Sequence, residues 1–210
     1  MIARLYESVV TQHYRDNRQM LFLMGPRQVG KTTTARQAGE RFEECFYLNW
    51  DNQDDRQTIV GGPNKVAKQV RLETLRSDPP LVIFDEIHKY GRWKGFLKGF
   101  FDSWGEDTAV LVTGSSRLDI FVKGGDSLMG RYFGYRLHPL SLAELADQTC
   151  PTQPLRKPIL LGDEDFQTLL EFGGFPEPFT RQERRFSNRW RRTRAQQLFK
   201  EDLRDLTRIQ

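Results

Sequence analysis

The stretch MLFLMGPRQVGKTT, residues 20–33, places an apolar run of strand length directly before a glycine-rich turn. The residues that follow, 32–41, have a composition compatible with a helix. Residues 25–32 match the pattern G-x-x-x-x-G-K-[ST], which binds phosphate groups when a strand precedes it and a helix follows it. A turn that binds nothing is the alternative. Because both flanks are present, the stretch predicts a phosphate-binding loop.

The chemistry expected of this loop follows from its residue types. Glycines let successive backbone N–H groups curl around phosphates at a helix N-terminus, where the helix dipole also favours negative charge. Lys31 is then expected to reach the β- and γ-phosphates of a nucleotide, and the Thr32 hydroxyl to complete the shell of a Mg²⁺ ion. The predicted nucleotide-binding residues are Gly25, Pro26, Arg27, Gln28, Val29, Gly30, Lys31, Thr32 and Thr33.

A second apolar run, residues 81–84, ends in two adjacent carboxylates, Asp85 and Glu86. A run without polar interruption is typical of a parallel strand buried on both faces. Successive residues at a strand end point in different directions, so Asp85 is expected to serve the Mg²⁺ ion and Glu86 to polarise an attacking water. An exposed acidic strand end is the alternative for this pair alone. Together with the loop, the pair predicts hydrolysis of a bound nucleotide.

The remaining pattern predicts an α/β fold with a mostly parallel sheet. Residues 109–113 form another uninterrupted apolar run, and an aromatic stripe at helical spacing, residues 93–101, lies between it and the acidic strand. Ligands bind at the carboxyl ends of the strands in such folds. Further helices are predicted over residues 2–16 and 64–76 and after a capping Ser141, and further strands over residues 45–50 and 132–138.

The chain is predicted to divide near residue 150. Residues 1–150 contain the predicted sheet and are expected to form the nucleotide-hydrolysing core, and a proline-rich linker begins at Cys150. Residues 151–210 are expected to form a small helical segment, with helices over 164–172 and 182–206.

The excess of basic residues is confined to the end of the chain. The formal net charge of +4 and the isoelectric point of about 9.1 would alone indicate an anionic partner. Residues 181–210, however, hold ten basic and four acidic residues, whereas residues 1–180 hold 22 basic and 24 acidic ones. The basic character therefore describes the C-terminal segment and not the predicted phosphate site.

The sequence lacks the marks of a membrane, secreted or zinc protein. No run approaches 18 consecutive apolar residues, and residues 1–17 lack the apolar core of a signal peptide. Cys45 and Cys150 are far apart, and the three histidines have no ligand spacing. We therefore expect a cytoplasmic protein with no membrane partner and no zinc site.

A series of motifs resembles one family over residues 18–208. The chain looks like the archaeal and bacterial "ATPase, AAA family" group of AAA-type P-loop ATPases. The resemblance implies a three-layer P-loop NTPase, a small C-terminal helical lid, and ATP hydrolysis with Mg²⁺. It also implies a further nuclease-like domain after the lid. The motifs are NWD at residues 49–51, DEIHK at 85–89, TGSS at 113–116, GR at 130–131, PLS at 139–141 and GGFPEP at 173–178.

The resemblance also implies roles for polar residues after the third apolar strand. Ser115 corresponds to a residue that lies between the acidic strand and the γ-phosphate, with Thr113 and Ser116 as alternatives. Arg131, after Gly130, corresponds to an arginine that reaches the nucleotide of a neighbouring copy, which implies a homo-oligomer. A surface arginine, or one paired to an acid of its own chain, is the alternative. Other candidate arginines are Arg117 and Arg136 and, in the lid, Arg181, Arg184 and Arg185.

Two other functions compete with a Mg²⁺-dependent ATPase that serves an unknown partner. Residues 181–194 could bind DNA through their arginines, with Phe186 and Trp190 as stacking groups, or could contact the absent C-terminal domain. An ordinary solvated helix is the alternative for this segment. The third possibility is a nucleotide-dependent interaction module with little turnover. ATP is preferred to GTP because of the family and because no N-K-x-D motif occurs.

Overall fold

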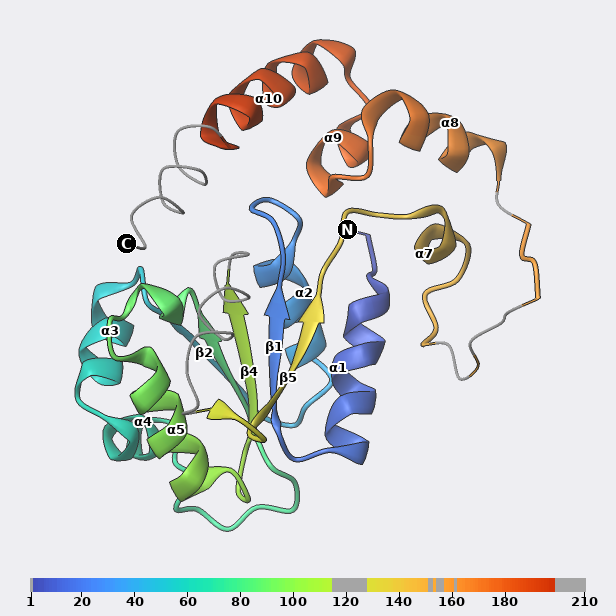
Figure 1. Ribbon diagram of the computed structural model, residues 1–210. Coiled ribbons are helices and arrows are strands. Elements are labelled where there is room, and N and C mark those ends of the chain that lie inside the picture. The colour runs from blue at the N-terminus through green and yellow to red at the C-terminus, as the bar shows by residue number, and fades with distance from the viewer. Residues whose placement is uncertain (1, 115–127, 151–152, 154–156, 161, 199–210) are drawn as a thin grey trace. The chain divides into compact units, whose positions relative to one another are not determined.

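The computed structural model describes residues 2–114, 128–150, 153, 157–160 and 162–198 (Figure 1). It divides into two compact units. The first comprises residues 3–138 and 148–156, and the second comprises residues 139–147 and 157–210. Residues 139–147, which precede the boundary expected at residue 150, therefore pack with the C-terminal helices.

The first unit is built on a five-stranded sheet with the order β2-β3-β4-β1-β5. All four neighbouring pairs are parallel, so the predicted parallel sheet is confirmed. β4 separates the strand before the glycine-rich loop from the acidic strand. The strands are β1 (Met20–Met24), β2 (Cys45–Asn49), β3 (Leu81–Asp85), β4 (Ala109–Gly114) and β5 (Tyr132–Arg136), the last ending two residues before the predicted end.

Burial along the strands matches their position in the sheet. Every residue of β1, β3 and β4 is buried, as expected for central parallel strands that are covered on both faces. The edge strands β2 and β5 each carry exposed positions. The uninterrupted apolar runs of the sequence therefore correspond to the three strands at the centre of the sheet.

Helices cover both faces of this sheet (Figure 1). The helices α1 and α2 pack against each other, and α2 contacts β1, β3 and β4. The opposite face packs against the apolar residues of α3, α4 and α5. The three layers that the sequence predicted are confirmed. The helices are α1 (Leu5–Asp16), α2 (Lys31–Gly39), α3 (Gln53–Val60), α4 (Pro63–Gln69) and α5 (Trp93–Trp104).

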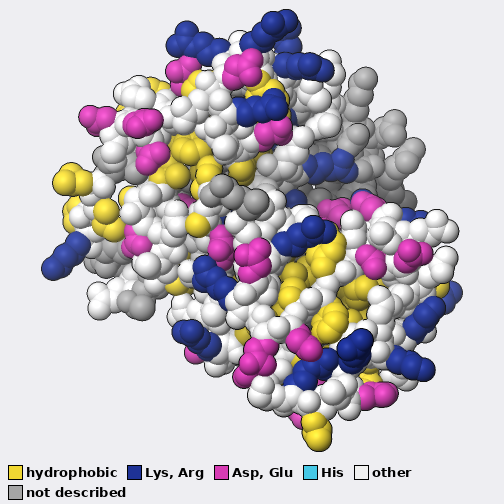
Figure 2. Space-filling model, turned by 180° about the vertical axis from the view of Figure 1, so that it is seen from behind, with side chains coloured by type: hydrophobic (Ala, Val, Ile, Leu, Met, Phe, Trp, Pro, Cys, Tyr) yellow, Lys and Arg dark blue, Asp and Glu magenta, His cyan; other side chains and the backbone are white. Residues whose placement is uncertain are grey.

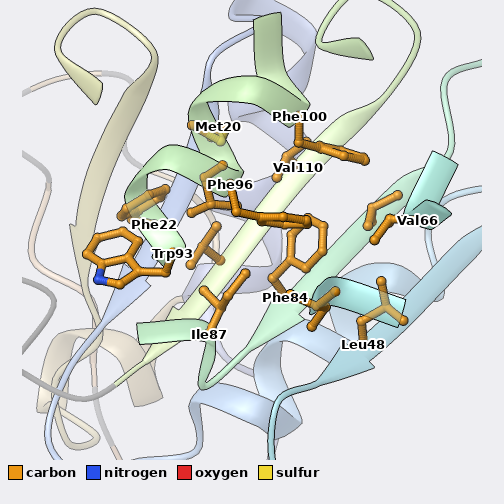
Figure 3. Packing of buried hydrophobic residues seen from close by; sticks show 14 of the residues in the cluster. Met20, Phe22, Leu48, Val66, Phe84, Ile87, Trp93, Phe96, Phe100 and Val110 are labelled. Atoms are coloured by element: carbon orange, nitrogen blue, oxygen red, sulfur yellow. The ribbon is translucent and has the colours of Figure 1, made fainter. Parts of the chain in front are cut away.

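The aromatic stripe of α5 forms the centre of the core (Figure 3). The ring of Phe84 on β3 meets Phe96 and Phe100 edge-on, at centroid distances of 5.5 and 5.4 Å. Edge-on pairs of this kind add to the gain from apolar burial, which is about 1.5–3 kcal/mol for one side chain. The stripe therefore packs against the strand that ends in Asp85 and is followed by Glu86.

The structure differs from the sequence prediction at two places between β2 and β3. The helix predicted over residues 64–76 ends at Gln69, because Arg71 adopts a left-handed conformation with a φ of 54° while Val70 and Leu72 on either side are both buried. The polar residues that follow β2, over which no helix was predicted, start α3. The Asn52 side chain caps this helix by accepting hydrogen bonds from two backbone N–H groups of its first turn.

The second unit is helical, as predicted. The Ser141 hydroxyl accepts a hydrogen bond from the Glu144 N–H and caps the first of its helices, which confirms the predicted cap. Part of the helix predicted over residues 182–206 lies beyond residue 198, outside the described residues. No described helix combines the length and apolar character needed to cross a membrane. The helices are α7 (Leu142–Ala146), α8 (Asp163–Phe172), α9 (Pro176–Arg181) and α10 (Arg184–Gln197).

Candidate nucleotide-binding site

The glycine-rich loop joins β1 to α2, and its backbone conformation depends on two of its glycines. Gly30 immediately precedes α2 and has a φ of 99°. Residues with a Cβ atom rarely adopt this conformation, whereas glycine adopts it readily. A Cβ atom on Gly25 would lie 2.5 Å from the backbone oxygen of Leu137. Both glycines are therefore required for the loop to curl at the N-terminus of α2, where free N–H groups favour an anion.

The Lys31 side chain lies inside this curl. It is 7% exposed, and its Nζ donates hydrogen bonds to the backbone oxygens of Gly25 and Pro26 at 3.0 and 2.8 Å. A buried ammonium group needs such partners because burial without them is costly. The loop therefore holds a positive charge in a fixed place, next to the N-terminus of a helix.

Asp85 lies at the same edge of the sheet and is 3% exposed. Strand register places it beside Asn49 of β2 and Thr113 of β4. Its Oδ2 accepts hydrogen bonds from the hydroxyls of Thr32 at 2.7 Å and Tyr47 at 2.6 Å. Its Oδ1 accepts one from the Thr113 hydroxyl. Three hydroxyl donors thus hold a buried carboxylate against the first turn of α2.

This donor set suits a Mg²⁺ ion. A carboxylate and a hydroxyl are hard oxygen ligands, and protein sites for Mg²⁺ commonly supply one or two such groups and leave the rest to phosphates and water. The described residues contain no cluster of three or more His, Cys, Asp or Glu side chains that could hold a metal ion. The hydrogen bond between Thr32 and Asp85 brings together the two residues predicted to hold the ion.

Glu86 follows directly, but its surroundings differ from those of Asp85. Its backbone is left-handed, with a φ of 56°, and its N–H donates to the Thr113 backbone oxygen. This conformation is strained for a residue with a side chain, at a cost of about 1–3 kcal/mol. A short 3₁₀ helix, Ile87–Lys89, follows Glu86 directly.

Two basic side chains lie near the Glu86 carboxylate. Its Oε2 is 3.3 Å from Lys89 Nζ and 3.7 Å from His88 Nε2. Lys89 Nζ also lies 2.6 Å from Asp51 Oδ2. Burial works against the charge on Lys89, but the hydrogen bond to Asp51 and the negative charges of Glu86 and Asp51 outweigh it and raise the pKa of Lys89. Lys89 is therefore a cation that holds the Glu86 side chain.

A family model described as "AAA domain" matches residues 17–146. The chain belongs to this AAA domain family. The match spans the glycine-rich loop, both acidic residues and all five strands. The family and the fold both place the chain among AAA-type P-loop ATPases, which are nucleotide-binding proteins. No curated protein matches this AAA domain.

Solved structures resemble the AAA domain in fold. The Walker-type ATPase of Pyrococcus abyssi aligns with 99% of this chain and 76% of its own, at 14% identity and a TM-score of 0.57. The Aeropyrum pernix ORC1 protein in complex with DNA aligns with 67% of this chain and 45% of its own, at 17% identity and a TM-score of 0.48. C. elegans PCH-2 aligns with 65% of this chain and 40% of its own, at 17% identity and a TM-score of 0.44. This chain thus spans less than half the length of the ORC1 and PCH-2 structures.

The arginine predicted to act as a finger is paired within the AAA domain. Arg131 makes two hydrogen bonds to the Asp102 carboxylate, at 2.6 and 3.1 Å, from a position just before β5 begins. The competing Arg136 ends β5 and lies in register with Met24, at the edge that carries the loop. Ser115, Ser116 and Arg117 fall outside the described residues. The predicted alternative to Ser115, Thr113, is buried against Asp85.

Three residues at the site of the AAA domain were given no role by the sequence analysis. Tyr47 donates to Asp85 and lies under the Arg36 guanidinium, which is 4.0 Å from the ring centroid. Burial, followed by the hydrogen bond to Asp85, raises the pKa of the Tyr47 hydroxyl, so that it remains a donor. Lys89 holds Glu86. Arg4, 4% exposed, donates to the Val29 backbone oxygen of the loop at 2.9 Å. In the strand register Tyr47 lies beside Ile83, two residues before Asp85, so no sequence motif links the Tyr47 and Asp85 side chains.

Proposed function

We propose that this AAA domain binds ATP with Mg²⁺ and hydrolyses the bond between its β- and γ-phosphates. The observation that carries the proposal is the 2.7 Å hydrogen bond between Thr32 Oγ1 and Asp85 Oδ2. It joins two motifs that lie 53 residues apart in sequence, at the edge of the sheet where Lys31 also lies. Thr32 and Asp85 would hold a Mg²⁺ ion, which would supply positive charge to compensate that of the phosphates.

The other residues act on the phosphates and on the water. In this proposal the backbone N–H groups of residues 25–33, except Pro26, which has none, and the Lys31 ammonium hold the phosphates and offset the charge that develops on them. Glu86 orients a water whose oxygen attacks the γ-phosphorus, while the bond to the β-phosphate oxygen breaks and ADP leaves. Ser115 would contact the γ-phosphate. Glu86 must release Lys89 to reach the water.

The contact between Glu86 and Lys89 also favours the second candidate function, a nucleotide-dependent interaction module with little turnover. A carboxylate held by an ammonium group 3.3 Å away is not free to orient a water. In an oligomer, Arg131 would act on the nucleotide of a neighbouring copy after leaving Asp102. Residues 181–194 would contact the partner that receives the output, a C-terminal domain or DNA. The free thiols of Cys45 and Cys150 support a cytoplasmic location.

Glu86→Gln tests the proposal because it keeps the size of the side chain and removes its charge. ATP affinity is expected to stay at the wild-type value, while phosphate release falls by about 100-fold or more, the range for loss of a general base. Glu73→Gln, at an exposed position outside the site, is the matched control and should change neither. Wild-type turnover by Glu86→Gln would contradict the assignment of Glu86. A wild-type protein that binds ATP with no measurable turnover would support the second candidate function.

A further inference from the structure

The helix α10 carries an unusual set of charges. Residues 184–197 include six arginines and no acidic residue. The first turn contains two of these arginines, where the helix dipole favours acidic side chains instead. α8 of the same unit follows the usual rule, with three acidic residues in its first turn. The charges of α10 therefore oppose its own local stability, which is a sign of a functional constraint.

Three of these arginines are used inside the second unit. Arg184 Nε forms an ion pair with the Glu171 carboxylate, and Arg191 donates to the Glu171 backbone oxygen. The Arg194 guanidinium lies over the Phe175 ring, 4.6 Å from its centroid. Phe175 in turn contacts Trp190, at a centroid distance of 5.0 Å. One side of α10 thus uses its arginines to pack against α8 and the start of α9.

The other three arginines lie on the opposite side of the helix. Arg185, Arg189 and Arg192 are four and three residues apart, so they share one face. All three are exposed, and none of their side chains makes a hydrogen bond, ion pair or ring contact in the part of the chain that the structure describes. Dark-blue side chains gather over α10 at the top of Figure 2. Together with Asn188, Thr193 and Gln196, the three arginines line a hollow of about 420 Å³.

These six residues, the outer face of α10, share two properties that limit the partner. All of them can donate hydrogen bonds, and none is acidic or apolar. Helices that bind membrane surfaces insert apolar side chains, and protein interfaces are centred on buried apolar anchors. The outer face offers neither. It offers a row of donors that spans about 10 Å from residue 185 to 192, at 1.5 Å per residue.

We propose that the outer face of α10 binds the phosphate backbone of a nucleic acid. A nucleic acid presents closely spaced negative charges along a line, and arginine, asparagine, glutamine and threonine side chains are the usual donors to its phosphate oxygens. Binding would also relieve the repulsion between the three arginines. The proposal rests on the assignment of residues 181–194 as the partner contact but requires no ATP.

The test is fluorescence anisotropy of labelled duplex DNA, single-stranded DNA and single-stranded RNA with the complete chain, without nucleotide, over a series of salt concentrations. The triple variant Arg185→Gln, Arg189→Gln, Arg192→Gln should bind at least about tenfold more weakly than wild type. Its slope of log affinity against log salt for duplex DNA should fall by nearly three, because each phosphate contact contributes about 0.9. Arg189→Gln alone should lower the slope by about 0.9.

The matched control removes three exposed cations from the first unit, as Arg15→Gln, Lys68→Gln, Arg92→Gln. Wild-type affinity and slope for this control support the proposal, and a loss as large as that of the α10 triple would overturn it by showing a net-charge effect. Wild-type binding by the α10 triple also overturns it. The proposal is also overturned if the wild-type protein binds no nucleic acid at low salt. It is equally overturned if the wild-type protein binds only vesicles that contain phosphatidylserine. ATP affinity of the α10 triple should equal that of wild type, which separates this proposal from the nucleotide site.

Discussion

The glycine-rich loop and the outer face of α10 both present positive charge, but they do so in opposite ways. Lys31 is buried and donates two hydrogen bonds to the loop that surrounds it. Arg185, Arg189 and Arg192 are exposed on one face of a helix. A buried cation among fixed N–H groups suits a small anion of defined shape, whereas exposed cations in a row suit a long one. The difference shows that net charge alone does not locate the functional site.

The largest expected effect concerns the carboxylate that holds the loop to the sheet. Asp85→Asn keeps the shape of the side chain but removes its charge and places an amide donor among three hydroxyl donors. Phosphate release from ATP should fall by about 100-fold or more, and the loss should not be recovered at high Mg²⁺. The measurement is the rate of phosphate release from ATP over a series of Mg²⁺ concentrations. Asp107→Asn, at an exposed site, is the control, and equal losses in both variants would contradict the role of Asp85.

A smaller effect is expected at Tyr47, which positions Asp85. Tyr47→Phe removes one hydrogen bond to the Asp85 carboxylate and leaves the ring under Arg36. The Mg²⁺ concentration for half-maximal turnover should rise about tenfold, which corresponds to about 1.4 kcal/mol for a hydrogen bond to a charged group. Tyr90→Phe should leave it unchanged, because the Tyr90 ring stacks on Trp50 and keeps that contact. An unchanged Mg²⁺ requirement in Tyr47→Phe would show that Thr32 and Thr113 suffice to hold Asp85.

The smallest effect separates the two sides of α10. Arg194→Ala removes a cation over the Phe175 ring and should lower the free energy of unfolding of the second unit by about 0.5–1 kcal/mol. Arg189→Ala should leave this free energy unchanged, since the Arg189 side chain makes no hydrogen bond, ion pair or ring contact with another described residue. Hydrogen exchange of the α10 backbone measures the difference. Equal protection in the two variants would remove the distinction between the packed and the outer arginines.

The sheet and its ligand edge could be predicted because their signals are local. Apolar runs identified β1, β3 and β4, and two motifs identified Lys31, Thr32, Asp85 and Glu86. The bend at Arg71 could not be predicted, because it depends on which neighbours the chain buries. Tyr47 and Lys89 were missed for a related reason. Their roles depend on strand register and on the strained turn at Glu86, which no single segment encodes.

ATP binding by Lys31→Ala tests the nucleotide site most directly. Isothermal titration of ATP with Mg²⁺ into the complete chain should show binding for wild type and for Lys68→Ala, an exposed lysine on α4. For Lys31→Ala, affinity should fall by about 100-fold or more, because the loop loses the ammonium that faces the phosphates. Wild-type ATP affinity in Lys31→Ala would contradict the assignment of the glycine-rich loop as the nucleotide site.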